Sequence, residues 1–218
     1  MVTYDEAWIY ITDSNKKRSI MYRPRDKKDL VQWYTECAES SPKGFMIATG
    51  ISHKGKLKIR RIEKNAKINS EYYQRNILIP IFKEDIPHLF GTDTPNVIFY
   101  HDKASSHVSW STVNFLETLR AKTGINTVEP KRIPVKSPDC SPMYFCTFGL
   151  LKRQIGNEHL KTIEMGLWKV VREEWEKLEL ATLRRCLLSW KVRCRAVAKN
   201  HGYPVEHLKY FRYGLKKK

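Results

Sequence analysis

The spacing of apolar residues along the chain restricts its fold more than any other feature. Strand-like patterns come first, because Trp8–Thr12 and Ser19–Tyr22 flank a polar turn and predict a hairpin. A second pair follows, in which the apolar stretch Gly44–Ser52 leads through a short turn into the alternating Lys56–Arg61. Helical and strand-like segments then alternate, and the last part of the chain is helical. This order predicts an α/β fold, with a mixed sheet and helices on its faces.

The later segments have clear ends. Asn69 is placed to cap a helix that ends near Pro87, and Gly124 is placed to end another helix. Pro134–Pro142 contains three prolines, so it predicts a loop. The predicted helices are Asn69–Pro87, His107–Lys122, Met143–Ile155, Thr162–Leu178 and Leu180–Ala198, the predicted strands are Val97–Tyr100 and Ile125–Val128, and Lys27–Ser40 fits either a short helix or a loop.

The length of 218 residues suits one domain, and no linker-like run divides it. We expect a domain over residues 1–210 and a basic tail over 211–218. The sequence begins with no signal-peptide pattern, and no apolar run approaches the roughly 20 residues that span a bilayer. The expectation is a soluble intracellular protein without a membrane partner.

Charge indicates the partner. The chain has 40 Lys and Arg against 23 Asp and Glu, a net charge of +17, and residues 152–218 carry 17 basic and 7 acidic side chains. Basic side chains that neutralise phosphates supply most of the sequence-independent affinity for nucleic acids, so a nucleic acid is the expected partner. The alternative is a basic surface without a nucleic-acid role. Nothing indicates a small-molecule substrate.

The five cysteines favour reduced thiols over a disulfide framework, because their number is odd and no CxxC is present. A metal site formed by Cys186, Cys194, His201 and His207 is the alternative, but the spacing fits no common zinc pattern.

Two aspartates are candidate metal ligands. Asp5 closes a strand-like start and Asp102 follows Val97–Tyr100, so both reach the same end of a sheet if these strands are neighbours. Carboxylates at strand ends suit Mg²⁺, and two such ions can activate a nucleophile and stabilise the leaving oxygen of a phosphodiester. Taken alone, two distant aspartates are more often surface residues than a catalytic pair.

Four local strings add a family resemblance. Val2–Tyr10 looks like the first acidic motif of mariner-family transposases, and His101–His107 resembles their second. Ser137–Pro142 resembles the approach to their third motif, and Gly202–Leu208 is similar to their closing motif. The order and spacing match over nearly the whole chain. The sequence therefore resembles the catalytic domain of a mariner-type DNA transposase.

The resemblance implies a ribonuclease-H-like mixed sheet flanked by helices, with a helical C-terminal part. It implies a site of three acids that hold two Mg²⁺ or Mn²⁺ ions, with Asp5 and Asp102 as the first two catalytic metal ligands and Glu6 and His107 beside them. For Glu6 and His107, a solvated or locally hydrogen-bonded side chain is the alternative. Such transposases cut DNA at inverted repeats and join the freed 3′ ends to a TA target, acting as dimers in the nucleus.

One residue departs from the family pattern. Tyr144 stands where the third acid is expected, two residues after Pro142. A tyrosine hydroxyl with a pKa near 10 is neutral at pH 7 and has neither the charge nor the paired oxygens of a carboxylate. We therefore expect weakened metal binding and severely reduced strand cleavage.

Neither nearby acid is a natural replacement. Asp139 lies earlier, in the proline-rich loop, and Glu158 lies about four helical turns beyond Tyr144 if the helix continues. Asp139 is expected to cap the following helix or to shape the loop.

Three functions remain open at this point. Family members carry helix-turn-helix modules ahead of the first acidic motif, whereas Asp5 stands near the start here, so we expect DNA binding through charge with little sequence preference. The first function is an impaired transposase catalytic domain. The second is an inactive remnant or co-opted nucleic-acid-binding protein. The third, a dimerising structural protein, rests on apolar helical stripes for which core packing is the simpler explanation.

Overall fold

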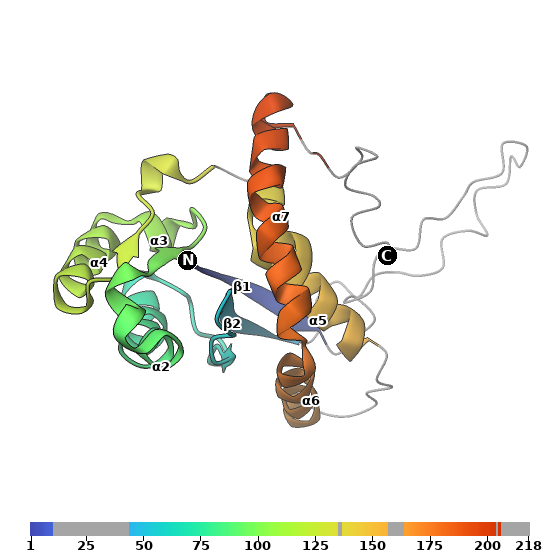
Figure 1. Cartoon of the computed structure of the whole chain (residues 1–218). Helices are drawn as coiled ribbons and strands as arrows, with labels where there is room; N and C mark the ends of the chain where they lie inside the picture. The colour runs from blue at the N-terminus through green and yellow to red at the C-terminus, as the bar shows by residue number, and fades with distance from the viewer. Residues whose placement is uncertain (11–43, 135–136, 157–163, 204, 206–218) are drawn as a thin grey trace, which may run out of the picture.

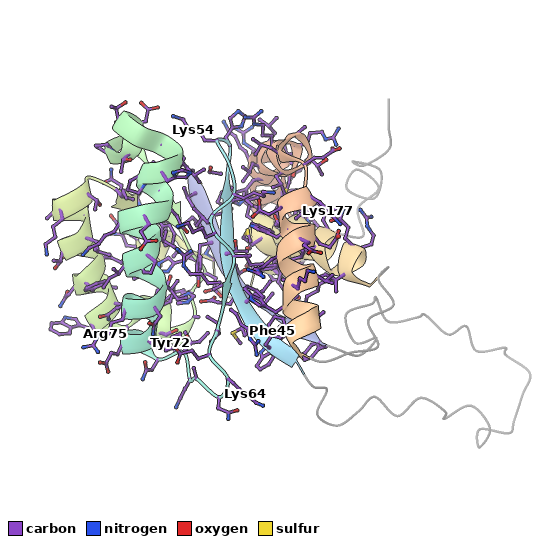
Figure 2. The ribbon with its side chains drawn as sticks, turned by 90° about the horizontal axis from the view of Figure 1, so that it is seen from below. Phe45, Lys54, Lys64, Tyr72, Arg75 and Lys177 are labelled. Atoms are coloured by element: carbon purple, nitrogen blue, oxygen red, sulfur yellow. The ribbon has the colours of Figure 1, made fainter. Side chains whose placement is uncertain are left out.

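A five-stranded mixed sheet lies at the centre of the molecule, and helices cover both of its faces (Figure 1). The computed structural model describes residues 1–10, 44–134, 137–156, 164–203 and 205. Figure 2 shows the sheet edge-on, with Tyr72 and Arg75 on one side of it and Lys177 on the other. The predicted α/β architecture is confirmed.

The strand order is β3-β2-β1-β4-β5. The long strands β1 (Val2–Tyr10) and β2 (Gly44–Ser52) pair antiparallel over their full length, and β3 (Arg60–Arg61) extends the sheet beyond β2. On the other side, β4 (Ile98–Tyr100) runs parallel to β1, and β5 (Asn126–Thr127) runs parallel to β4.

One sequence prediction for the first strands was wrong, and others fall on residues that the structure does not describe. Asp5 does not close a strand, because β1 continues through it to Tyr10 and pairs with β2. The expected partner hairpin strand Ser19–Tyr22 and the segment Lys27–Ser40 lie outside the described residues. The second predicted pair is confirmed, since β2 pairs with β3 and Ile51 bridges to Lys56.

The first helical layer begins at Asn69, whose side-chain Oδ1 accepts a hydrogen bond from the Tyr72 backbone N–H at 2.8 Å. This capping prediction is confirmed. The helix continues beyond Pro87. Two of its stretches have wide π turns, and each is followed two residues later by a proline, Pro80 or Pro87, which lacks the N–H of a regular helix and crowds the preceding turn. Its parts are α1 (Ser70–Tyr72), η3 (Tyr73–Leu78), η4 (Ile81–Asp85) and α2 (Ile86–Phe90), followed by η5 (Gly91–Asn96).

The expected helix over His107–Lys122 is interrupted. The short α3 (Ser105–Val108) ends at Ser109, which has extended backbone angles, and α4 (Trp110–Thr123) follows. Ser109 Oγ accepts a hydrogen bond from Thr112 N–H at 3.2 Å, so the break creates an N-cap. Gly124 ends α4 in the left-handed region (φ 76°), as its position in the sequence predicted.

The second helical layer contains the last elements of the chain. The loop before it holds the short turns η6 (Pro130–Arg132) and η7 (Pro138–Cys140). The helices are η8 (Met143–Thr147), α5 (Phe148–Ile155), α6 (Glu164–Lys177) and α7 (Leu180–Lys199), close to the predicted ranges. The apolar stripe of α7 packs inward, with Leu183 and Val197 buried, as predicted.

Each face of the sheet has its own core, because side chains alternate along β1. Val2 and Tyr4 belong to the core under the first helical layer, whereas Ile9 belongs to the core under the second. Trp175, fully buried, lies in the second core and donates from Nε1 to the Leu57 carbonyl at 3.1 Å. Asp5 therefore faces the second layer and Glu6 the first.

Within the described part of the chain, no helix is long and apolar enough to cross a membrane. The expected boundary at residue 210 lies beyond the described residues.

Candidate metal-binding site

Asp5 and Asp102 come together because their strands are parallel neighbours. Thr3 pairs with Tyr100, so the residues two positions further along each strand direction are Asp5 and Asp102. Side chains two positions apart point to the same face of a sheet. The negative charge of Asp102 contributes to a raised pKa of Asp5, as expected for two neighbouring carboxyl groups.

The segment after the proline loop contributes a third part of this site. Ser141 Oγ donates a hydrogen bond to Asp5 Oδ2 at 3.2 Å. The first turn of η8 starts on the same residue, since Tyr144 N–H donates to the Ser141 carbonyl at 3.0 Å. Tyr144 thus lies one helical turn beyond Ser141, the residue that contacts Asp5, but its side chain is 64% exposed.

Glu6 and His107 form a buried network on the other side of β1. His107 is 1% exposed, and its Nε2 lies 3.1 Å from Glu6 Oε1. Its Nδ1 lies 2.6 Å from Asp102 Oδ1, an ion-pair contact. Tyr4 also donates to Glu6 Oε1, at 2.9 Å. His107 therefore links Glu6 to Asp102.

Stacked rings hold His107 in place. The rings of Tyr73 and His107 stack with centroids 4.0 Å apart, and His101 stacks on His107 at 5.1 Å. The Tyr73 hydroxyl and His101 Nδ1 are hydrogen-bonded at 2.8 Å. Burial and the positive charge of His107 lower the pKa of His101 to about 3, so His101 is neutral.

The electrostatics differ sharply between the two aspartates. Burial, followed by the charges of Glu6 and Asp102, raises the pKa of Asp5 to about 7, although hydrogen bonds from Glu6 N–H and Ser141 act in the opposite direction. Burial also acts to raise the pKa of Asp102, but the contacts with His107 outweigh it, and that pKa lies below its usual value. Burial opposes protonation of His107, yet its contacts with Asp102 and Glu6 raise its pKa to about 10.

These residues fit a divalent cation only in part. Asp5 and Asp102 supply carboxylate oxygens, which are the ligands that Mg²⁺ prefers, and a cation there would relieve the repulsion that raises the pKa of Asp5. Among the described residues, no group of three or more His, Cys, Asp or Glu side chains is arranged to hold a metal. Glu6 does not complete the set, since Tyr4 and His107 engage it on the opposite face of β1.

The other acidic candidates lie elsewhere. Asp139 Oδ2 accepts a hydrogen bond from Val205 N–H at 2.9 Å, and its Oδ1 lies 3.6 Å from Arg193 Nη2. It does not cap the following helix, which has no side-chain cap, so that part of the expectation was wrong. Asp139 instead ties the loop to α7. Glu158 and His207 lie outside the described residues.

Sequence reasoning assigned no role to several residues that form this neighbourhood. Ser141 was part of a family string, but only the folded chain brings its hydroxyl to Asp5, 136 positions away. The local pattern of Tyr4 and Tyr73 predicts only a strand and a helix, and it does not indicate that they hold Glu6, His101 and His107 in place.

No protein-family model matches the chain, and no curated protein matches it. Solved structures do. A pre-cleavage Mos1 transpososome superposes with a TM-score of 0.70 at 20% identity, covering 94% of this chain and 56% of that one. The mariner Mos1 paired-end complex with Mg gives 0.72 at 22%, with the same coverages. The catalytic domain of Mos1 mariner transposase gives 0.66 at 18%, covering 94% of this chain and 83% of that one.

The chain thus spans just over half of the transposase chains in the complexes and most of the isolated catalytic domain. The match covers 94% of this chain, and the five-stranded mixed sheet with helices on both faces has the ribonuclease-H-like architecture that the resemblance implied. At this level of identity the similarity concerns the fold. The described chain has the fold of the Mos1 mariner transposase catalytic domain.

Proposed function

We propose that this chain is the catalytic domain of a mariner-type DNA transposase with an impaired metal site. The observation that carries the proposal is the parallel pairing of β1 with β4, which brings Asp5 beside Asp102 while Ser141 joins them from the third motif segment. Asp5 and Asp102 would hold Mg²⁺ or Mn²⁺. Such ions, when bound there, would supply activation of the attacking oxygen and stabilisation of the leaving oxygen of a phosphodiester.

Two of the three expected acidic positions are occupied by aspartates that neighbouring side chains hold in place, and the third is not acidic. His107 holds Asp102 ionised and oriented, and Ser141 orients the Asp5 carboxylate. Tyr144 provides no third carboxylate, so we propose weak metal binding and severely reduced strand cleavage. DNA is the proposed partner, supported by the net charge of +17 and by solved neighbours described as a transpososome and a strand-transfer complex. Dimerisation and a nuclear location belong to the same proposal.

The test compares metal-dependent nicking of supercoiled DNA by the wild-type chain and by Tyr144→Asp. Tyr203→Asp is the matched control, because Tyr203 is 68% exposed and Tyr144 is 64% exposed, so both variants add the same charge at an exposed tyrosine. We expect nicking to rise by at least tenfold only in Tyr144→Asp, and to disappear in a Tyr144→Asp and Asp5→Asn double variant. Equal inactivity of Tyr144→Asp and wild type would show that the missing acid is not the main defect.

The second candidate is a nucleic-acid-binding protein without catalysis. The observation that favours it is the absence of a complete three-ligand group among the described residues. In that case DNA binding should weaken steeply with salt while neither the wild type nor Tyr144→Asp cuts DNA. Binding that is absent or independent of salt contradicts both candidates.

A further inference from the structure

Four cysteines from two segments meet where α7 packs against η7 and η8. Cys194 of α7 packs against the apolar cluster that holds Cys140 of η7, and the two thiols shift each other's pKa. Cys146 of η8 and Cys186 of α7 affect each other's pKa in the same way. The earlier cysteine of the first segment, Cys140, is paired with the later cysteine of α7, Cys194, so the two segments run antiparallel here. All four are free thiols.

The Cys140–Cys194 pair lies between two polar anchors. Trp190 Nε1 donates to the Cys140 carbonyl at 2.7 Å, and Arg193 Nε donates to the Asp139 carbonyl at 3.2 Å. Cys140 is 4% exposed and shares an apolar cluster with Val197, against which Cys194 packs. The two segments are therefore held together by bonds that do not depend on the thiols.

The two sulfurs of this pair differ in exposure and in acidity. Contact with Cys140 lowers the pKa of Cys194 to about 7, and the nearby Trp190 and the Arg193 guanidinium act in the same direction. The same contact and burial raise the pKa of Cys140. Cys194 is partly exposed, whereas Cys140 is buried. A partly exposed sulfur that ionises near neutral pH is the usual nucleophile of a dithiol, and a buried neighbour is its resolving partner.

We propose that Cys140 and Cys194 form an oxidation-sensitive dithiol that closes to a disulfide when the chain meets hydrogen peroxide. The Cys194 thiolate attacks one peroxide oxygen, the O–O bond breaks, and a sulfenic acid and hydroxide form. Cys140 then attacks the Cys194 sulfur, the S–S bond forms, the S–O bond breaks, and water leaves with the Cys140 proton. Two thiols are oxidised, and one peroxide is reduced to two waters overall.

The disulfide would join α7 covalently to the segment that reaches the metal-binding site. Ser141, next to Cys140, donates a hydrogen bond to Asp5. The backbone N–H of Tyr144, in the first turn of η8, donates to the Ser141 carbonyl. The disulfide would close the loop between Cys140 and Cys194. Closing this loop restricts the unfolded chain, so we expect the oxidised protein to melt roughly 5–10 °C above the reduced protein.

The experiment treats the reduced whole chain with hydrogen peroxide, blocks remaining thiols in denaturant, digests with trypsin, and identifies linked peptides by mass. Cleavage at Arg185, Lys191 and Arg193 places Cys186 and Cys194 on different peptides. Cys140 and Cys146 share a peptide, so Cys140→Ser and Cys146→Ser assign the partner. Circular dichroism of each variant checks that it folds, and fragmentation of the linked wild-type peptide assigns the partner independently.

We expect the Cys194 peptide to be linked in the wild type, in Cys146→Ser and in Cys186→Ser, and to be unlinked in Cys140→Ser, where Cys194 proceeds to sulfinic acid. A reductant should reverse the link and the rise in melting temperature. The proposal is overturned if Cys186 is the main linked residue, if wild-type Cys194 reaches sulfinic acid without a link, or if all thiols survive peroxide.

Discussion

In the metal-free protein the ionised Asp5 carboxylate lowers the free energy of unfolding, so replacing Asp5 with a neutral residue should raise it. The pKa of its carboxyl rises from the ordinary 3.8 to about 7 on folding. The folded chain therefore binds more protons than the unfolded chain between about pH 4 and 7, and stability falls as pH rises through that range. Above pH 7 the ionised carboxylate opposes folding in full.

The size of the effect follows from the same shift. Each tenfold change in proton affinity corresponds to about 1.4 kcal/mol, so ionised Asp5 lowers the free energy of unfolding by roughly 2–4 kcal/mol at pH 8. Asp5→Asn keeps an oxygen that can accept from Ser141 and removes the charge. We expect the variant to be more stable than wild type by that amount at pH 8, and the difference to shrink below about 1 kcal/mol near pH 4.5.

Urea unfolding of both proteins in EDTA, at a series of pH values, measures this difference. Asp102→Asn is the control with the opposite sign, because it removes an ion-pair partner of the buried, protonated His107 and should destabilise the protein at pH 8. The reasoning is refuted if Asp5→Asn gives no gain at pH 8, or if its gain is the same at every pH.

Two further predictions concern the scaffold. Arg60→Ala should lower the free energy of unfolding by about 3–5 kcal/mol, because it leaves the Asp85 carboxylate, 1% exposed, without its bidentate partner. Arg75→Ala, in the exposed pair with Glu71, is the control and should change the free energy of unfolding by less than about 0.5 kcal/mol. Similar losses in urea titrations of both variants would contradict this. Asn69→Ala should cost about 1 kcal/mol through loss of the helix cap, and Asn69→Asp should restore most of it, as thermal melting can check.

Local signals were enough for much of the fold. The caps Asn69 and Gly124, and the ranges of α6 and α7, follow from side chains that act within one or two turns, so the sequence specifies them directly. Prediction failed where distant partners decide. The helical pattern is broken at Ser109, whose hydroxyl accepts a hydrogen bond from the distant Ser70. The extension of β1 past Asp5 depends on pairing with β2.

Some properties of the candidate site follow from the sequence, and others follow only from the folded chain. The sequence by itself determined which acids are present, that Tyr144 stands at the third position, and that the chain is strongly basic, because these are properties of residue identity. Only the tertiary structure decided that β1 and β4 are parallel neighbours, that Ser141 reaches Asp5, and that His107 joins Glu6 to Asp102. It also decided the charge states, since the pKa values of Asp5 and His107 depend on burial and on charges contributed from distant parts of the chain.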